Sequence, residues 1–116
     1  MTDVVDEFLL AARAFRAALT DYDRDDAASA RRVRNALARV YLAAVFLPSH
    51  GGDADPEPAE HGDPLGAVDE ALADAIAVLQ ADEPGAVWRV RRDFELRWGG
   101  LALDVLRPLH RVATGA

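Results

Sequence analysis

The spacing of the apolar residues is the feature that most restricts how this chain of 116 residues can fold. In four stretches, apolar side chains recur every three or four positions, and this period places them on one face of an α-helix. No stretch alternates apolar and polar residues at every second position, as a half-buried strand would. The sequence therefore predicts an all-α fold, a four-helix bundle that forms a single domain over residues 1–116.

The first two helices are predicted from their caps and their apolar faces. Thr2 or Asp3 can cap the first helix, and Asp25 or Asp26 can cap the second, which Pro48 ends. The inward residues of the first are Val5, Phe8, Ala12, Phe15, Leu19 and Tyr22, and those of the second are Val33, Leu37, Val40, Ala44 and Leu47. Residues 40–47 are apolar on every side, so we expect several neighbours to bury this end of the second helix.

A third helix is predicted to begin at Asp63 and Pro64, a capping carboxylate followed by proline at the first helical position. Its inward residues are Leu65, Val68, Leu72, Ile76 and Leu79. The preceding residues, about 48–64, contain four of the six prolines and a run of acids without any apolar period. We expect a mobile, acidic, Pro/Gly-rich loop there.

The last predicted helix carries two apolar stripes. The main stripe is Val87, Val90, Phe94, Trp98, Leu101, Val105, Leu109 and Val112, and the second is Trp88, Leu96, Leu103 and Leu106. Gly99 and Gly100 fall in the middle of this helix and Pro108 near its end. We therefore expect the helix to be kinked or split at the glycine pair or at the proline.

Composition narrows the function classes. The net charge is −7, which disfavours binding to nucleic acid because phosphate backbones repel an acidic protein. The first residues are acidic rather than basic and apolar, and no apolar run is long enough to cross a membrane. The chain has no cysteine, which excludes disulfides and thiolate metal ligands. We expect a cytoplasmic protein that does not contact membranes.

The usual residues of catalytic and metal sites are sparse. His50 and His61 stand eleven positions apart with prolines between them, a spacing that matches no common metal motif. Ser29 and Ser49 are the only serines, and the histidine beside Ser49 in the sequence does not make a catalytic dyad. We therefore expect no metal, no cofactor and no catalytic residues, and an enzyme is the less favoured function.

The last helix resembles a bacterial family known as domain of unknown function 5063. The matching residues are Trp88, Arg91, Phe94, Trp98, Gly99, Leu106, Arg107, Leu109 and His110. The chain departs from the family pattern at Val90 and Arg92, where an aromatic is expected, and at Arg97 and Leu101, where a histidine is expected. The resemblance implies a helical fold of bacterial origin and carries no known activity.

The polar residues of the last helix suggest an interaction surface. Arg89, Arg91 and Arg97 each have an acidic residue four positions away, the spacing of intrahelical ion pairs. Arg92 is left on the second stripe, between Trp88 and Leu96. Trp98 lies on the main stripe and is expected in the core. The predicted interaction or ligand surface comprises Trp88, Arg91, Arg92, Leu96 and Trp98.

Two functions remain open from these residues. The first is a non-enzymatic protein-interaction module that binds a protein partner or a second copy of itself, as a homodimer, through the last helix. The second is a small-molecule-binding protein or enzyme with a pocket between helices, lined by Trp98, Phe94, Tyr41 and an arginine.

Overall fold

The computed structural model describes residues 3–48 and 63–115. Three helices come first: α1 (Val4–Thr20), α2 (Ala27–Val45) and α3 (Pro64–Gln80). A last helix follows in three consecutive segments, α4 (Ala86–Asp93), the π-helical η1 (Phe94–Trp98) and α5 (Gly99–Thr114). The described residues contain no strand, and the predicted all-α four-helix bundle is confirmed. The predicted acidic loop lies almost wholly outside the described residues.

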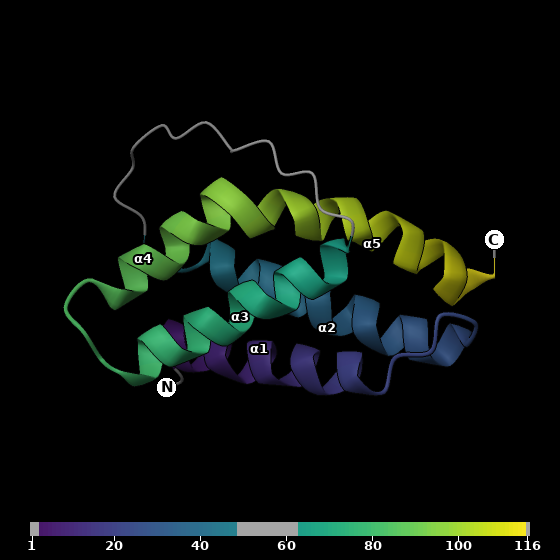
Figure 1. The fold of residues 1–116 in the computed structure, drawn as a ribbon, viewed down its shortest axis with the longest axis horizontal. Helices are drawn as coiled ribbons and strands as arrows, with labels where there is room; N and C mark the ends of the chain where they lie inside the picture. Colours follow the sequence, from purple (N-terminus) through teal and green to yellow (C-terminus); the bar gives the residue numbers. More distant parts are fainter. Residues whose placement is uncertain (1–2, 49–62, 116) are drawn as a thin grey trace.

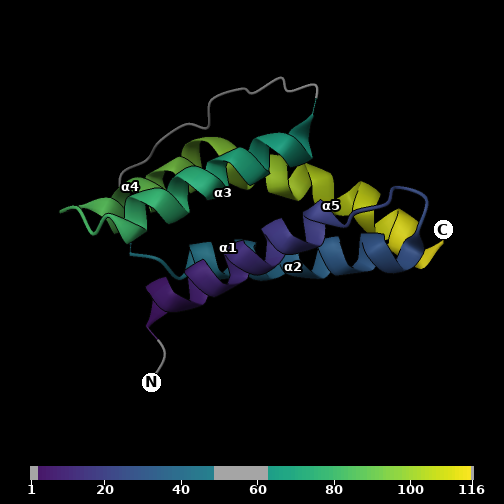
Figure 2. The same cartoon turned by 60° about the horizontal axis from the view of Figure 1, so that its bottom comes forward.

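The helices form two layers (Figures 1 and 2). α1 and α2 run antiparallel in one layer, and α3 packs with the last helix in the other. α5 returns along α2, so the C-terminal end of α5 lies beside the N-terminal end of α2. The shortest extent of the molecule is 20 Å, which corresponds to two stacked helices of about 10 Å each.

Three aspartates begin the first three helices. Asp3 and Asp26 accept backbone N–H bonds at the starts of α1 and α2, and Asp63 accepts from Gly66 N at the start of α3. Pro64 occupies the first turn of α3, where no N–H partner is needed. The predicted helix starts are therefore confirmed, with Asp3 chosen over Thr2 and Asp26 over Asp25.

The core contains the residues that the apolar periods predicted. Every predicted inward residue of α1, α2 and α3 is either buried or half-buried against the core. The largest fully buried side chains are Trp98, Phe8, Phe15, Leu37 and Leu72. Helical periodicity alone therefore identified most of the interior.

The prediction that residues 40–47 are buried on every side is wrong. Val40, Ala44 and Leu47 are buried, but Leu42 is 58% exposed and Phe46 is 72% exposed. With two layers in the fold, α2 has packed neighbours on only part of its circumference. The outer side at the C-terminal end of α2 is therefore exposed and apolar, with Leu42, Val45 and Phe46 not covered by any described residue.

The irregularity in the last helix lies just before the glycine pair and is a π-turn rather than a break. The backbone N–H of Gly99 donates to the carbonyl of Phe94, five residues earlier. A Cβ on Gly99 would lie 2.6 Å from that carbonyl oxygen, so the turn requires glycine. The change from η1 to α5 falls at Gly99, at the predicted glycine pair, whereas α5 continues through Pro108, so the alternative of a split at Pro108 is wrong.

The π-turn explains which residues of the last helix face inward. Buried residues recur at a spacing of four before, within and after the π-turn: Ala86, Val90, Phe94, Trp98 and Ala102. In a regular α-helix each such step overshoots a full turn by about 40°. The extra residue in the π-turn offsets much of this drift. After the turn, Ala102 and Ala113 are buried. Leu101 and Val112, which were predicted to face inward, are half-buried and exposed, respectively.

Among the described residues, no helix combines the length and the apolar character needed to cross a bilayer.

Candidate functional site

Trp98 belongs to an aromatic cluster inside the bundle. The residue is 0% exposed. The centroid of its ring lies 4.7 Å from that of Phe94 and 6.3 Å from that of Phe8. The ring centroids of Tyr41 and Phe94 are 5.1 Å apart. Trp98, Phe94 and Tyr41 thus come together as the pocket hypothesis predicted. They pack against one another, however, and none of them lines a hollow described below.

The indole N–H of Trp98 is buried without a hydrogen-bond partner among the described residues. An unpaired buried donor costs free energy, about 1–3 kcal/mol relative to a paired one. The packing of the large ring between Phe8 and Phe94 therefore outweighs this penalty. Trp98 is a core residue and offers nothing to a surface partner.

Arg91 is held against the C-terminal end of α2. Its Nη1 donates to the carbonyl oxygens of Ala44 at 2.7 Å and Val45 at 2.6 Å, and its Nε donates to Glu95 Oε1 at 2.6 Å. The guanidinium carbon lies 5.5 Å from the Phe94 ring centroid, and the side chain is only 17% exposed. The predicted Arg91–Glu95 pair is confirmed, but Arg91 ties two helices together instead of facing a partner.

Trp88, Arg92 and Leu96 are the predicted residues that face outward. Trp88 is 46% exposed, Arg92 is exposed and Leu96 is half-buried. Arg92 makes no ion pair with any residue in the described part of the chain. The predicted set therefore divides into an inner pair, Arg91 and Trp98, and an outer row of three.

Trp88 lines a hollow at the end of the bundle, which we call the end pocket. It has a volume of about 510 Å³ and lies where the start of α1, the end of α3 and the start of α4 meet. Its lining is largely apolar but includes three carboxylates and no basic residue: Asp3, Val4, Val5, Pro48, Leu79, Asp82, Glu83, Gly85, Ala86, Val87 and Trp88.

A second hollow, the outer groove, adjoins the end pocket and shares Val4 with it. This groove of about 290 Å³ lies between α1 and α2 and is lined by Val4, Glu7, Arg39, Leu42, Ala43 and Phe46. Val4, Leu42 and Phe46 are all exposed. Sequence reasoning missed these three residues, although a helix end that is apolar on every side was the available indication of them.

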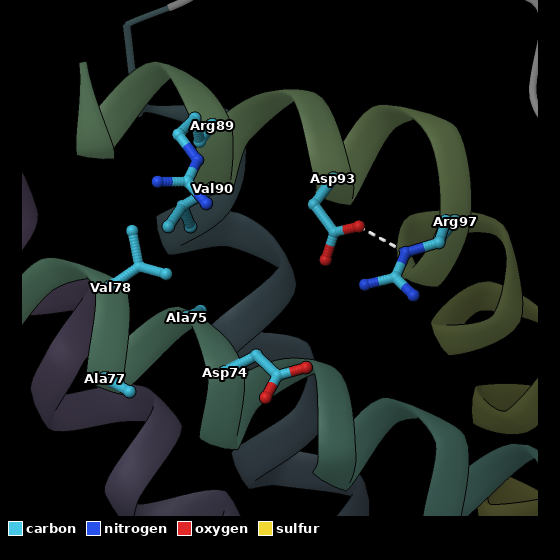
Figure 3. Close-up of a pocket in the computed structure, with 8 residues that line it drawn as sticks. All are labelled: Asp74, Ala75, Ala77, Val78, Arg89, Val90, Asp93 and Arg97. Atoms are coloured by element: carbon cyan, nitrogen blue, oxygen red, sulfur yellow. Dashed lines mark hydrogen bonds and ion pairs between the residues drawn. The ribbon is translucent and has the colours of Figure 1, made fainter.

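A third hollow, the α3–α4 groove, has mixed charge (Figure 3). It has a volume of about 430 Å³ and is lined by Asp74, Ala75, Ala77, Val78, Arg89, Val90, Asp93 and Arg97. Arg97 is ion-paired with Asp93, as its spacing predicted, and Arg89 pairs with Glu83 at 3.2 Å rather than with Asp93. Asp74 extends from α3 toward the last helix, so two acids and two arginines surround an apolar floor.

The polar residues considered for catalysis have structural contacts. Ser29 is buried and its Oγ accepts the N–H of Asp23 at 2.8 Å in the turn before α2. His110 meets Arg34 through Nδ1 at 3.0 Å, while His50, His61 and Ser49 lie outside the described residues. Over residues 3–48 and 63–115, no three histidine or acidic side chains converge closely enough to hold a metal ion.

Comparison with known proteins gives no relative from which a function could be transferred. No family model matches the chain, and no curated protein or solved structure matches it. The resemblance to domain of unknown function 5063 stays a prediction from the last helix. The surface of the bundle is therefore the basis for a functional assignment.

Proposed function

We propose that this chain is a non-enzymatic protein-interaction module that binds its partner at the end of the bundle. The observation that carries the proposal is the gathering of four exposed apolar residues in two adjoining hollows: Val4, Leu42, Phe46 and Trp88. Contiguous exposed apolar surface on a small protein usually marks a binding site, with aromatic residues as its anchors. Trp88 is common to this surface and to the surface predicted from sequence.

The proposed docking surface is centred on the end pocket and the outer groove, whereas the sequence-based hypothesis centred it on the last helix. Arg92 and Leu96 continue from Trp88 along the outside of the last helix and form the edge of the surface rather than its centre. The cysteine-free, acidic composition supports a cytoplasmic setting for this binding, with no role in contacting nucleic acid or membranes.

Site-specific photo-crosslinking tests this function. A benzophenone amino acid is placed at position 46 or 88, and at position 104 on α5, which is also exposed, as the control. The expected result in cells of the host is an adduct of one defined mass from positions 46 and 88 and none from 104. Equal labelling from all three positions would contradict the proposal, as would an absence of adducts at 46 and 88.

The α3–α4 groove supports a second candidate, the binding of a small molecule that carries both charges. Asp74 and Asp93 could meet an ammonium group while Arg89 and Arg97 meet a carboxylate, above a floor of alanine and valine. A ligand present at a hundredfold over its Kd should add about 2.7 kcal/mol of stability. A panel of amino acids and related zwitterions is therefore screened by thermal shift, with Arg97→Gln as the variant that should lose the response. An unchanged Tm across the panel would remove this candidate.

A further inference from the structure

The end pocket combines an apolar interior with a lining whose charged side chains are all negative. Val4, Leu79 and Val87 supply apolar surface, whereas Asp3, Asp82 and Glu83 supply negative charge, and no basic side chain is part of the lining. The whole chain has a net charge of −7, so its overall field also favours a cationic ligand over an anionic one. A ligand that fits must pair apolar area with positive charge.

The three carboxylates differ in how far neighbouring groups of the protein neutralise their charge. Glu83 pairs with Arg89 at 3.2 Å, but both side chains are at least 60% exposed, so water screens the pair strongly. Among the described residues, the carboxylate of Asp3 accepts only a long bond of 3.4 Å from Val5 N, and Asp82 has no ion pair. No described cation neutralises Asp3 or Asp82, so both carboxylates can attract a cationic ligand.

Trp88 provides an aromatic face beside these carboxylates. Its Cε3 would lie 4.0 Å from a Cβ placed on Gly85, so the ring packs close to the turn between α3 and α4 while 46% of the residue stays exposed. The pocket thus places a half-exposed aromatic side chain beside its carboxylates, where it adds apolar contact area for the stem of a cationic side chain.

The outer groove extends this recognition along α1 and α2. Leu42 and Phe46 make its walls apolar, Glu7 and Arg39 add one charge of each sign, and Val4 joins it to the end pocket. The outer groove therefore favours apolar side chains, and the selection for positive charge belongs to the end pocket. A ligand that lies across both hollows therefore needs a cation at one position and apolar side chains at neighbouring positions. Amphipathic helical segments have this pattern, since their anchors recur every three or four residues.

From these observations we infer that the partner docks with a basic amphipathic segment, placing a lysine or arginine in the end pocket and apolar side chains in the outer groove. This inference rests on the proposed function and names the chemistry of the partner. A second copy of the chain is disfavoured as the occupant, because two molecules that each carry −7 repel one another.

Charge-neutral variants allow a test that leaves the fold intact. Asp3→Asn keeps the N-cap of α1, because asparagine caps as well as aspartate. Asp82 has a φ of 52°, in the left-handed region, and asparagine adopts this conformation readily. The double variant D3N/D82N therefore removes two charges from the end pocket, and D25N/D104N removes two exposed charges elsewhere as its matched control.

The probe is a synthetic helical peptide of leucine and lysine with an amphipathic period, titrated by calorimetry at low ionic strength. We expect D3N/D82N to weaken its binding about tenfold, and D25N/D104N to change it less than twofold. Trp88→Ala should also weaken binding by about tenfold or more. The same peptide with glutamate in place of every lysine should not bind.

Two outcomes would overturn the inference: equal weakening by D3N/D82N and D25N/D104N, or equal binding of the lysine and glutamate peptides. The first would indicate attraction to net charge alone, and the second would indicate apolar contact without charge selection. Either result leaves the photo-crosslinking at positions 46 and 88 unaffected. Failure of the partner chemistry is therefore distinguishable from failure of the interaction function.

Discussion

At the scale of single residues, the polar side chains of the last helix have very different environments although their sequence pattern is uniform. Arg91 and Arg92 are neighbours, yet Arg91 donates to two carbonyls of α2 and Arg92 is exposed. The carbonyls of Ala44 and Val45 belong to the last turn of α2, where the regular helical donors four residues on are missing, and the Ala44 carbonyl also accepts the N–H of Leu47 at 3.1 Å. A cationic donor satisfies them more strongly than a neutral one.

Arg91→Met should lower the free energy of unfolding by about 2 kcal/mol, because it removes charged hydrogen bonds while keeping most of the apolar stem. Arg92→Met is the matched control and should change stability by less than about 0.5 kcal/mol. Urea unfolding followed by circular dichroism measures both. Equal stability of the two variants would contradict the capping role of Arg91.

The two tryptophans should give separable fluorescence. In Trp88→Phe, only the buried Trp98 remains, so we expect blue-shifted emission and little quenching by acrylamide. The native protein should be quenched more strongly because Trp88 is 46% exposed. Strong quenching that persists in Trp88→Phe would mean that Trp98 is accessible to solvent.

At the scale of the elements, the π-turn of η1 is the feature on which the register of the last helix depends. It gives Phe94 and Trp98 the same inward face as Val90 and Ala102. π-turns are rare because they cost more than regular helix, and they persist where packing compensates. Here the aromatic contacts of Phe94 and Trp98 provide that compensation.

The adjacent glycines offer a matched pair for testing this turn. Gly99→Ala should cost about 1–3 kcal/mol, because the new methyl group meets the Phe94 carbonyl oxygen and ring. Gly100→Ala has no atom within 4 Å of the added Cβ and should stabilise the helix by about 0.5–1 kcal/mol. Thermal unfolding of both variants should therefore give Tm shifts of opposite sign; shifts of the same sign would argue against the π-turn.

The apolar periods predicted the elements well because burial of one face dominates helix formation in a small bundle. Phe8, Leu37 and Leu72 could be identified as core residues without coordinates. The π-turn could not be predicted, since its hydrogen bond depends on tertiary packing that overrides local preference. The docking surface was only partly predictable: Trp88 stood out as an exposed aromatic, whereas Phe46 on α2 resembled a core residue in the sequence.

At the scale of the whole molecule, the charge distribution and the apolar surface both affect self-association. The outer face of the last helix exposes Leu103 strongly, but Leu96 and Leu106 are half-buried and Arg92 and Arg107 interrupt the row. These residues interrupt the apolar area that a dimer interface through this face would bury. Mutual repulsion of acidic copies acts in the same direction.

We therefore expect a monomer at tens of micromolar, at both low and physiological salt. Sedimentation velocity measures the mass directly. A dimer that is lost in Leu103→Glu and kept in Phe46→Glu would instead support self-association through the last helix.

Both ends of α2 are attached to the last helix, and this has a consequence for the order of events during synthesis. Arg91 donates to carbonyls near the C-terminal end of α2, and Arg31, in its second turn, donates to the carbonyl of Ala113 at 3.4 Å. A nascent chain that has emerged only as far as α3 lacks both attachments and the Phe94 and Trp98 side chains of its core. We therefore expect folding of this domain on the ribosome to wait until residues 86–115 have emerged, and the apolar faces of α1 and α2 to stay accessible to chaperones until then.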